Sequence, residues 1–338
     1  MASTIEMVKI DSTDDLCADE LWDEILALQN ELVPQIAKMP NAMPRLTACP
    51  VCSRRDLAPA IEKDGFRIDQ CGGCGFRFTN PAPNEQQLEL FYNSRIKQLE
   101  NIAFESTRAA RLPIFERRLN LIRQYVTGGK LLDIGGANGI FVDAIARADA
   151  AFEVFIVDLN RDAVAKLHQK YPAVQAIEGD ALKHTGSYDV ITLWDTIEHL
   201  PDVNRVAAHL LSLLRPGGFL FLSTPNVHSF EHSVGQYRHP QILPLSHVNY
   251  FAPSTLGHLL ERHNFKVVDC LTPNGSFDIA YVKRMMSDGD ADLSQLGGFL
   301  KQHLQSPAFA DDFAALISKH CLAGNLLMIA QRPPASRG

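Results

Sequence analysis

Short apolar runs alternate with stretches of helical periodicity from residue 130 towards the C-terminal end of the chain. Between the runs, apolar residues recur at helical spacing near 138–148, 160–171, 202–214 and 253–263, which predicts amphipathic helices. Strands that alternate with helices are typical of a mainly parallel sheet covered on both faces. We therefore expect a doubly wound α/β fold in this part of the chain. The predicted strands are Lys130–Ile134, Phe152–Val157, Val174–Ile177, Tyr188–Trp194, Gly218–Ser223, Phe265–Cys270 and Leu326–Ala330.

The N-terminal third has a different pattern. Helical spacing extends over 14–38, and two further helical stretches follow near 85–99 and 106–126. We interpret the first as a packing helix, with a lid or a dimer contact as alternatives. The third has a basic face, which we interpret as a solvated face, with a handle for an anionic substrate as the alternative. Its arginines are Arg108, Arg111, Arg117, Arg118 and Arg123.

An insertion at about 275–320 separates the last two predicted strands. It combines a polar turn region, Ser287–Asp292, with helical stretches near 294–304 and 308–320. The insertion is expected either to cover an acceptor pocket or to form a dimer surface, and the pattern does not decide between them.

Four cysteines form two C-x-x-C pairs, Cys49 with Cys52 and Cys71 with Cys74, and 18 residues separate Cys52 from Cys71. This spacing is typical of a four-thiolate zinc site, in which each tight turn brings two sulfurs to about 2.3 Å from one ion. Because all four ligands come from the protein, the predicted metal is structural. Two unrelated turns with free thiols are the alternative.

The residues around the second cysteine pair complete the pattern of a zinc ribbon. Gly65–Asp69 and Gly75–Thr79 are predicted strands, one on each side of the turn. Gly72, Gly73 and Gly75 permit the positive φ angles that such a turn requires.

Composition narrows the class of protein. The 338 residues include 32 Lys and Arg against 39 Asp and Glu, a formal net charge of −7, and 46% of them are hydrophobic. This balance argues against a disordered chain and against a nucleic-acid partner, and the odd number of cysteines, seven, argues against a disulfide framework. No apolar stretch approaches the roughly 18 residues of a membrane span, and the N-terminus lacks the features of a secretory signal. A cytoplasmic protein is therefore expected.

A glycine-rich turn follows the first strand of the α/β region. Asp133 and Ile134 lead into Gly135, Gly136 and a helix that begins after Gly139. Such a turn lets the backbone approach a ligand, and the helix N-terminus offers free N–H donors. The dinucleotide fingerprint G-x-G-x-x-G is absent, because its last glycine would fall at Ile140.

Acidic residues follow three further strands. Asp158 ends the second strand, Asp180 follows the third and Asp195 follows the fourth. Open α/β sheets bind ligands at the carboxyl ends of their strands, where a carboxylate can accept hydrogen bonds from ribose hydroxyls. Each acidic residue alone is more simply a solvated strand end. Matching positions on successive strands favour a nucleoside-like ligand.

Five segments between residues 131 and 226 follow one another in an order that resembles that of the class I S-adenosylmethionine-dependent methyltransferases. The resemblance implies a seven-stranded sheet whose final strand is antiparallel. It also implies that Asp133 lies near the methionine amino group, Asp158 near the ribose and Asp180 near the adenine. The other residues it assigns to the cofactor pocket are Gly135, Gly136, Asn138, Gly139, Leu159, Ala181, Trp194 and Asp195. The segments are LLDIGGANG (131–139), VDL (157–159), EGDA (178–181), YDVITLWDTIEHLPD (188–202) and LLRPGGFLFLSTPN (213–226).

A first candidate site for the methyl acceptor is Asp195-Thr196-Ile197-Glu198-His199. If a helix starts after the fourth strand, Asp195 can share a face with Glu198 or His199. The segment is similar to the E-x-x-E-H arrangement that holds a divalent metal in ubiquinone-type O-methyltransferases, with Asp195 at the first position. The alternative is that Glu198 and His199 only cap and orient the helix.

A second candidate site lies in His228–Tyr250, between the fifth strand and the next helix. His247-Val248-Asn249-Tyr250-Phe251 and the ribbon end CGFRFTNPAP (74–83) resemble the zinc-ribbon sugar C-methyltransferases, which act on nucleotide-linked keto-sugars. The resemblance implies that His247 is the base and Tyr250 a pocket residue. The sequence departs from that family at Ser246, where glutamate is usual, and it ends near where an additional C-terminal domain would begin. The alternative for His247 is a buried histidine bonded to backbone.

These features predict three parts: an N-terminal helical segment (1–45), a zinc ribbon with a linker helix (46–105) and an S-adenosylmethionine-dependent methyltransferase domain (106–332). The expected acceptor is a small molecule, such as a nucleotide-linked sugar or a natural-product precursor. Alternatives are a metal-dependent O-methyltransferase and an RNA- or protein-modifying enzyme that uses the ribbon for recognition. We expect no membrane partner, and a homodimer is a possible assembly.

Overall fold

A computed structural model describes residues 19–136, 138–272 and 295–335 of the chain. A seven-stranded sheet forms its centre, with the strand order β10-β11-β8-β7-β4-β5-β6. All neighbouring pairs among β4 to β8 are parallel, whereas β11 is antiparallel to both of its neighbours. The prediction of a mainly parallel sheet with an antiparallel final strand is therefore confirmed. The strands are β4 (Gly128–Ile134), β5 (Ala151–Asp158), β6 (Gln175–Glu178), β7 (Tyr188–Trp194), β8 (Leu214–Pro225), β10 (Lys266–Leu271) and β11 (Asn325–Gln331).

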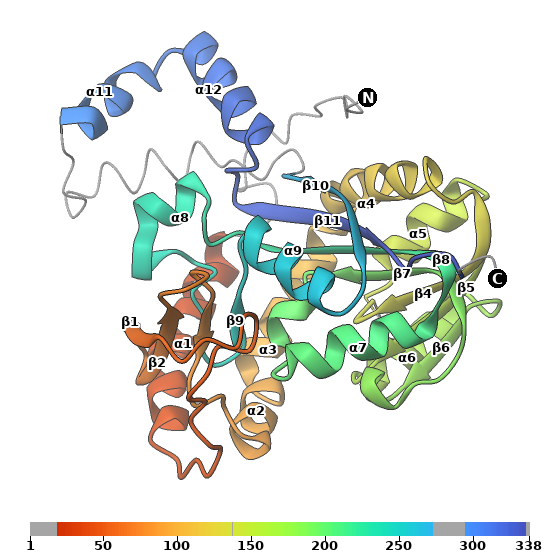
Figure 1. Cartoon of the computed structure of the whole chain (residues 1–338), viewed down its shortest axis with the longest axis horizontal. Helices are drawn as coiled ribbons and strands as arrows, with labels where there is room; N and C mark the ends of the chain where they lie inside the picture. Colours follow the sequence, from red (N-terminus) through yellow and green to blue (C-terminus); the bar gives the residue numbers. More distant parts are fainter. Residues whose placement is uncertain (1–18, 137, 273–294, 336–338) are drawn as a thin grey trace.

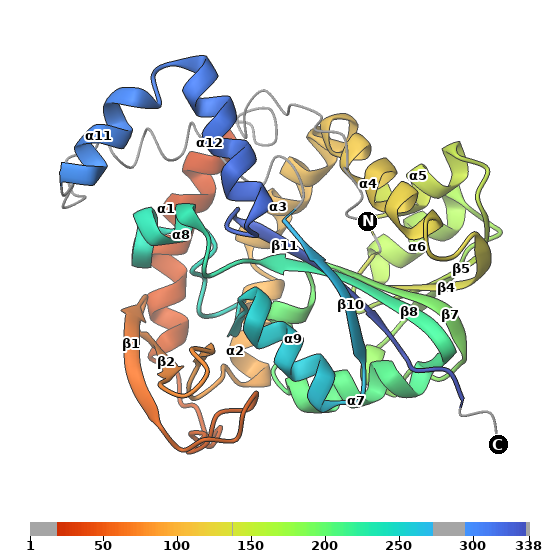
Figure 2. The ribbon, with the colours of Figure 1, turned by 45° about the horizontal axis from the view of Figure 1, so that its top comes forward.

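Helices cover both faces of this sheet, because successive strand residues point to opposite sides. Leu131 of β4 packs in a core with Leu119 and Phe141, whereas its neighbour Leu132 packs in a second core with Val206 and Leu256. The first face carries α4 (Arg108–Arg123), α5 (Ile140–Arg147) and α6 (Arg161–Lys170); the second carries α7 (Val203–Leu213) and α9 (Pro253–Arg262) (Figures 1 and 2).

The cysteine-rich region forms a four-stranded antiparallel sheet of order β1-β2-β3-β9. The predicted strands at 65–69 and 75–79 correspond to β2 and β3, while β1 was not predicted. The fourth strand comes from the far end of the sequence, after β8, and its Asn249 pairs with Phe78. We call residues 49–79 the ribbon. Its sheet includes β9 of the α/β domain, so the two parts are joined by hydrogen bonds between strands. The strands are β1 (Leu57–Lys63), β2 (Phe66–Cys71), β3 (Arg77–Thr79) and β9 (Asn249–Tyr250).

Apolar packing strengthens this connection. The ring centroids of Phe76, in the ribbon, and Phe251, beside β9, lie 5.1 Å apart. Phe76, Cys49 and Val51 belong to the same buried core as the α7 and α9 side of the large sheet. The ribbon therefore packs against the α/β domain as part of one core (Figure 2).

Three helices surround the ribbon and lead into the domain: α1 (Asp19–Ala37), α2 (Glu85–Tyr92) and α3 (Arg95–Ser106). Side chains of α1, including Ile25 and Ile36, pack with Phe66 of β2 and Ile96 of α3. The two helical stretches predicted between 85 and 126 are three helices, because breaks at 93–94 and at Thr107 separate α2, α3 and α4. The described part of the N-terminal helix is thus a packing helix.

The remaining helices lie towards the end of the chain. They are α8 (Phe230–Gly235), α11 (Gln295–His303) and α12 (Pro307–Lys319). The last two match the predicted stretches at 294–304 and 308–320, whereas the predicted polar turn Ser287–Asp292 lies outside the described residues. No helix within the described ranges has both the length and the apolarity needed to span a membrane.

Candidate functional site

The two cysteine turns have the backbone of metal-binding knuckles. The N–H of Ser53 donates to the carbonyl of Cys49, and the N–H of Gly75 donates to the carbonyl of Cys71, each at 2.8 Å. The two turns also share a conformation, since Ser53 has φ +62° and Gly75 has φ +79°. Positive φ was expected of three glycines, but in the second turn only Gly75 adopts it. Ser53 occupies the matching position of the first turn, so the sequence of that turn contains no glycine that would predict the positive φ.

The four sulfurs converge on one point. The Sγ atoms of Cys49 and Cys74 lie 3.6 Å apart, those of Cys52 and Cys71 lie 3.5 Å apart, and all four fall within 4.8 Å of one another. Four thiolates at about 2.3 Å from a tetrahedral zinc ion are about 3.8 Å apart. The geometry therefore fits a closed, structural zinc site.

The glycine-rich turn between β4 and α5 forms a cradle at the carboxyl edge of the large sheet. Gly135 and Gly139 both have positive φ, +79° and +74°. A Cβ on Gly136 would lie 1.8 Å from Oδ2 of Asp133, so only glycine leaves this side open. The carbonyl of Asn138 accepts from Arg108 of α4 at 2.7 Å, and this hydrogen bond holds the turn against α4.

Asp133 carries an unpaired oxygen into this cradle. Its Oδ1 accepts from the hydroxyl of Thr192 at 2.6 Å, whereas its Oδ2 is buried with no hydrogen-bond partner among the described residues. Burial raises the pKa of Asp133 to about 7. A buried carboxylate oxygen without a donor is costly, and a ligand ammonium placed here would satisfy it.

The other predicted cofactor residues lie at neighbouring strand ends. Asp158 ends β5 and its Oδ1 accepts from the N–H of Asn160 at 2.8 Å, and the following Leu159 is 77% exposed. Asp180 and Ala181 follow β6, and Oδ1 of Asp180 caps a short 3₁₀ turn by accepting from Leu182. Both carboxylates are thus oriented by backbone donors at the expected edge.

Arg118 of α4 lies against Trp194 and Asp195 at the end of β7. The residue is 8% exposed. Its guanidinium stacks on Trp194, 4.6 Å from the ring centroid, and donates to Asp195 at 3.2 Å. The interpretation of this helix face as solvated is therefore wrong for Arg118. Nε of Arg118 and Nε1 of Trp194 are buried without partners in the described part of the chain. Orphaned donors beside Asp133 suit a zwitterionic ligand such as the methionine portion of the cofactor.

Asp195 does not share a helix face with Glu198, contrary to the expectation. Asp195 has φ +50°, and the chain continues into a single 3₁₀ turn, Ile197–His199. The carboxylate instead accepts from Arg118 and, at 2.7 Å, from the Asn325 amide. Although burial opposes ionisation, these partners keep the pKa of Asp195 below its usual range.

Glu198 and His199 instead meet His247, from the segment before β9. One potential ligand atom of each lies within 4.8 Å of the others, and the two imidazole rings are edge-to-face with centroids 4.8 Å apart. The N–H of Val248 donates to the Glu198 carbonyl at 2.9 Å, which fixes the two segments together. We call these three residues the Glu198 cluster.

Backbone carbonyls set the tautomers in the Glu198 cluster. Nδ1 of His199 lies 2.8 Å from the Ser246 carbonyl, and Nδ1 of His247 lies 3.0 Å from the Gln241 carbonyl. A carbonyl only accepts, so both Nδ1 atoms donate and both Nε2 atoms carry lone pairs. Burial lowers the pKa of His199 to about 4 and that of His247 well below its usual value, so both rings are neutral at pH 7.

Glu198 is the acidic member of the cluster. It is 1% exposed, and its Oε2 accepts from the hydroxyl of Thr224 at 2.9 Å. Burial, followed by the charge of Asp195, raises the pKa of Glu198 to about 8. Two imidazole lone pairs beside a buried carboxyl group form a donor set that fits a divalent cation.

Tyr250, the predicted pocket residue, is buried. Its ring packs in an apolar cluster with Ile68 of the ribbon and Val227 of the segment after β8. Burial raises the pKa of its hydroxyl well above the usual range. Tyr250 thus helps to pack the ribbon against the α/β domain.

The pKa of Asp133 predicts how cofactor affinity depends on pH. Because its value is raised to about 7, the carboxyl is protonated below that pH and cannot pair with the cofactor ammonium. The dissociation constant of S-adenosylmethionine should therefore rise as pH falls from 7.5 to 5.5, by up to about tenfold per unit. Equilibrium dialysis across this range measures it. Asp133→Asn should bind more weakly and lose the pH dependence; a parallel slope in this variant would exclude Asp133 as the titrating group.

The fold and this edge define a class: an open α/β domain whose glycine turn and acidic strand ends suit S-adenosylmethionine. Residues 105–269 match the family model of a methyltransferase domain. Over 105 residues the chain is 36% identical to the ubiquinone biosynthesis O-methyltransferases of Escherichia coli and Shigella boydii; the match covers 29% of this chain and 44% of those proteins. Residues 105–269 thus form a methyltransferase domain, and the chain spans less than half the length of these relatives.

Solved structures with related folds were also found. A SAM-dependent methyltransferase from Archaeoglobus fulgidus is 18% identical, with 68% of this chain and 98% of that chain covered and a TM-score of 0.45. A Haemonchus contortus phosphoethanolamine N-methyltransferase 2 complex is 17% identical, with 69% and 58% covered and a TM-score of 0.43.

Proposed function

We propose that the protein transfers the methyl group of S-adenosylmethionine to a small-molecule acceptor bound between the cofactor edge and the zinc ribbon. The observation that carries this proposal is the convergence of His247 with Glu198 and His199, which follow β7 in a turn whose Thr196 packs against Gly135 of the cradle. Methyl transfer is an in-line displacement from an activated donor, so the protein has to align the acceptor and remove its proton.

The Glu198 cluster suits proton removal. Its two imidazoles are neutral, and their Nε2 lone pairs are free of backbone bonds. In this proposal the acceptor donates its hydroxyl or carbon-bound proton to Nε2 of His247, and His199 holds the acceptor on the other side. A nucleotide-linked keto-sugar, as implied by the resemblance of the ribbon and the His247 motif, is one acceptor class for this chemistry.

A second candidate is O-methylation with a divalent cation held by the Glu198 cluster. The buried carboxyl of Glu198 accepts from a neutral hydroxyl and has no cationic side chain bonded to it among the described residues, a situation that a cation would relieve. When bound, such a cation would lower the pKa of a coordinated acceptor hydroxyl. The similarity to ubiquinone biosynthesis O-methyltransferases over 29% of the chain is compatible with this candidate. Asp195 then serves to hold Arg118 and the β7 end.

The zinc ribbon contributes structure in both candidates. We propose that Cys49, Cys52, Cys71 and Cys74 bind one zinc ion, which holds β2 and β3 against β9 and so positions one wall of the acceptor site. RNA or a protein as acceptor is a further outcome to be tested, disfavoured by the net charge of −7.

The acceptor class is tested by incubating the protein with methyl-labelled cofactor and separate sets of keto- and hydroxy-sugar nucleotides, phenols, transfer RNA and protein. We expect label in a small-molecule product. Label only in the RNA or protein fraction would contradict the proposal.

Substitution of His247 tests both candidates, and substitution of Glu198 separates them. His247→Ala should lower kcat by about 10²- to 10⁴-fold in either case, since it removes the base or a ligand. Glu198→Gln should abolish activity and metal binding at the cluster if a cation is required, but lower kcat much less if His247 acts as a simple base. Steady-state kinetics after chelation and Mg²⁺ readdition measure the difference. His258→Ala, an exposed histidine of α9, is the matched control; a parent-like rate in His247→Ala would refute both candidates.

A further inference from the structure

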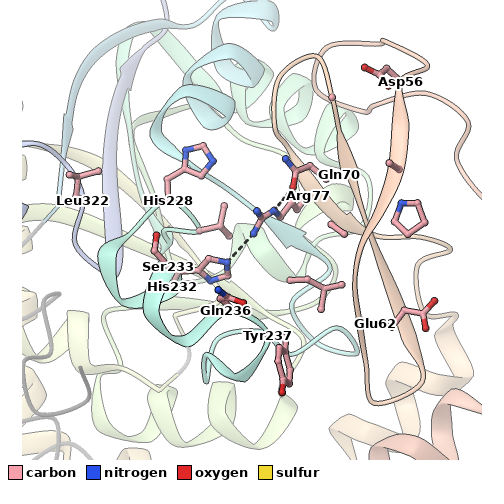
Figure 3. Close-up of a pocket in the computed structure, with 16 residues that line it drawn as sticks. Asp56, Glu62, Gln70, Arg77, His228, His232, Ser233, Gln236, Tyr237 and Leu322 are labelled. Carbon is pink, nitrogen blue, oxygen red and sulfur yellow. Dashed lines mark hydrogen bonds between the residues drawn. The ribbon is translucent and has the colours of Figure 1, made fainter. Parts of the chain in front are cut away.

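A cavity of about 1000 Å³ lies between the ribbon and the segment that follows β8. Residues of β1, β2 and β3 form one wall, and His228, His232 and Ser233 form the other (Figure 3). The Glu198 cluster is not part of its lining. The volume is at the upper end of the range of small-molecule sites.

Arg77 of β3 projects into this cavity with uncharged partners. Its Nε donates to Oε1 of Gln70 at 2.8 Å, and its Nη1 lies 3.0 Å from Nε2 of His232 (Figure 3). Arginine has only donors, so Nε2 of His232 accepts and this ring is neutral. Burial, then the neighbouring His239, lowers the pKa of His232 to about 3, which agrees with this tautomer.

The charges around the cavity leave Arg77 without a counter-ion. It is the one Lys or Arg in the described lining, and no carboxylate in the described part of the chain forms an ion pair with it. The two acidic lining residues, Asp56 and Glu62, lie on the β1 side, away from His232 (Figure 3). A guanidinium normally pairs with a carboxylate or a phosphate in a two-point contact.

The cavity adjoins the edge of the sheet at which the cofactor is expected. Val227 and His228 directly follow the end of β8, at the carboxyl edge of the parallel strands. Leu322, on the same wall, precedes β11, whose Asn325 donates to Asp195 of the cofactor pocket. A ligand anchored at Arg77 can therefore extend towards the reacting centre.

We propose that Arg77 holds an oxyanion, a carboxylate or a phosphate, carried by the methyl acceptor, and that Gln70 and His232 orient the guanidinium for this contact. The assignment of the anion to the acceptor rests on the proposed function. The site also gives the ribbon a role in recognition, because Arg77 follows Cys74 by three residues on the strand that the knuckle fixes.

The test is calorimetric titration of the intact, zinc-loaded protein with inorganic pyrophosphate and, separately, with malonate, at constant ionic strength. We expect saturable binding of at least one anion, and the preferred one distinguishes phosphate from carboxylate. Arg77→Gln should weaken this binding by about ten- to a hundredfold, the value of a charge-assisted contact. Arg161→Gln, at an exposed arginine of α6, should leave it unchanged.

Gln70→Glu provides a second variant that preserves shape. It places a carboxylate against Nε of Arg77, which should occupy the guanidinium and weaken anion binding without disturbing the fold. If Arg77→Gln fails to fold, this variant decides. Parent-like anion affinity in either folded variant, or no binding of either anion by the parent protein, would overturn the proposal.

Separate titration with S-adenosylmethionine keeps this result distinct from the proposed function. Anion binding that depends on Arg77 in a protein that fails to bind the cofactor would support the anion site and contradict the methyltransferase proposal. Cofactor binding without anion binding would support the methyltransferase proposal and contradict the anion site.

Discussion

Replacing Cys71 with serine is expected to release the zinc ion and to unfold the ribbon. Cys71 is fully buried, its sulfur lies 3.5 Å from that of Cys52, and its N–H donates to the carbonyl of Phe76, the residue before β3. Zinc binding contributes about 10–16 kcal/mol in zinc-finger peptides, far more than the packing of so small a sheet. Because β9 pairs with β3, loss of the ribbon should also disturb the segment that carries His247.

Metal analysis of purified protein measures this effect directly. We expect about one zinc per chain in the parent protein and almost none in Cys71→Ser, together with a lower Tm and loss of methyl transfer. Cys270→Ser is the matched control, since Cys270 is a partly buried cysteine of β10 outside the cluster. A Cys71→Ser protein that retained the metal would refute the four-thiolate site.

Replacing Asp158 with alanine should remove most cofactor affinity. The carboxylate ends β5 at the edge where the ribose is expected, and two charge-assisted hydrogen bonds to ribose hydroxyls are worth about 3–6 kcal/mol together. The dissociation constant should therefore rise by at least about a hundredfold. Equilibrium dialysis with labelled cofactor measures the change.

Two further variants control for local damage. Asp158→Asn keeps an oxygen for the Asn160 N–H and should lie between parent and alanine in affinity. Asp162→Ala, at an exposed position in the first turn of α6, should bind like the parent protein. Equal losses in Asp158→Ala and Asp162→Ala would indicate a general effect on β5 and α6 instead of a ribose contact.

The large sheet was predictable because its signals are local. Each strand of the domain is an apolar run bounded by turn residues, and the glycines between β4 and α5 are needed where the structure has positive φ. The C-x-x-C spacing likewise predicted the convergence of four sulfurs, since two tight turns suffice to bring them together.

Contacts between distant segments were not predictable in the same way. Glu198 and His247 were assigned to two separate candidate sites, and the hydrogen bonds of Val248 to Glu198 and of His199 to Ser246 bring them together. The sequence predicts a solvated position for Arg118, because nothing in it places Trp194 beneath the guanidinium. Arg77 gave no signal at all, since its partner His232 is 155 residues away.

Binding of S-adenosylmethionine by the glycine cradle and the acidic edge underlies the function proposed for this protein. Its most direct test is calorimetric titration of the unmodified protein with S-adenosylmethionine and with S-adenosylhomocysteine at pH 7.5. We expect saturable binding of both ligands at one site per chain, and S-adenosylmethionine should bind more tightly at pH 7.5 than at pH 6. No measurable heat with either ligand, in protein shown to be folded and to contain zinc, would contradict it.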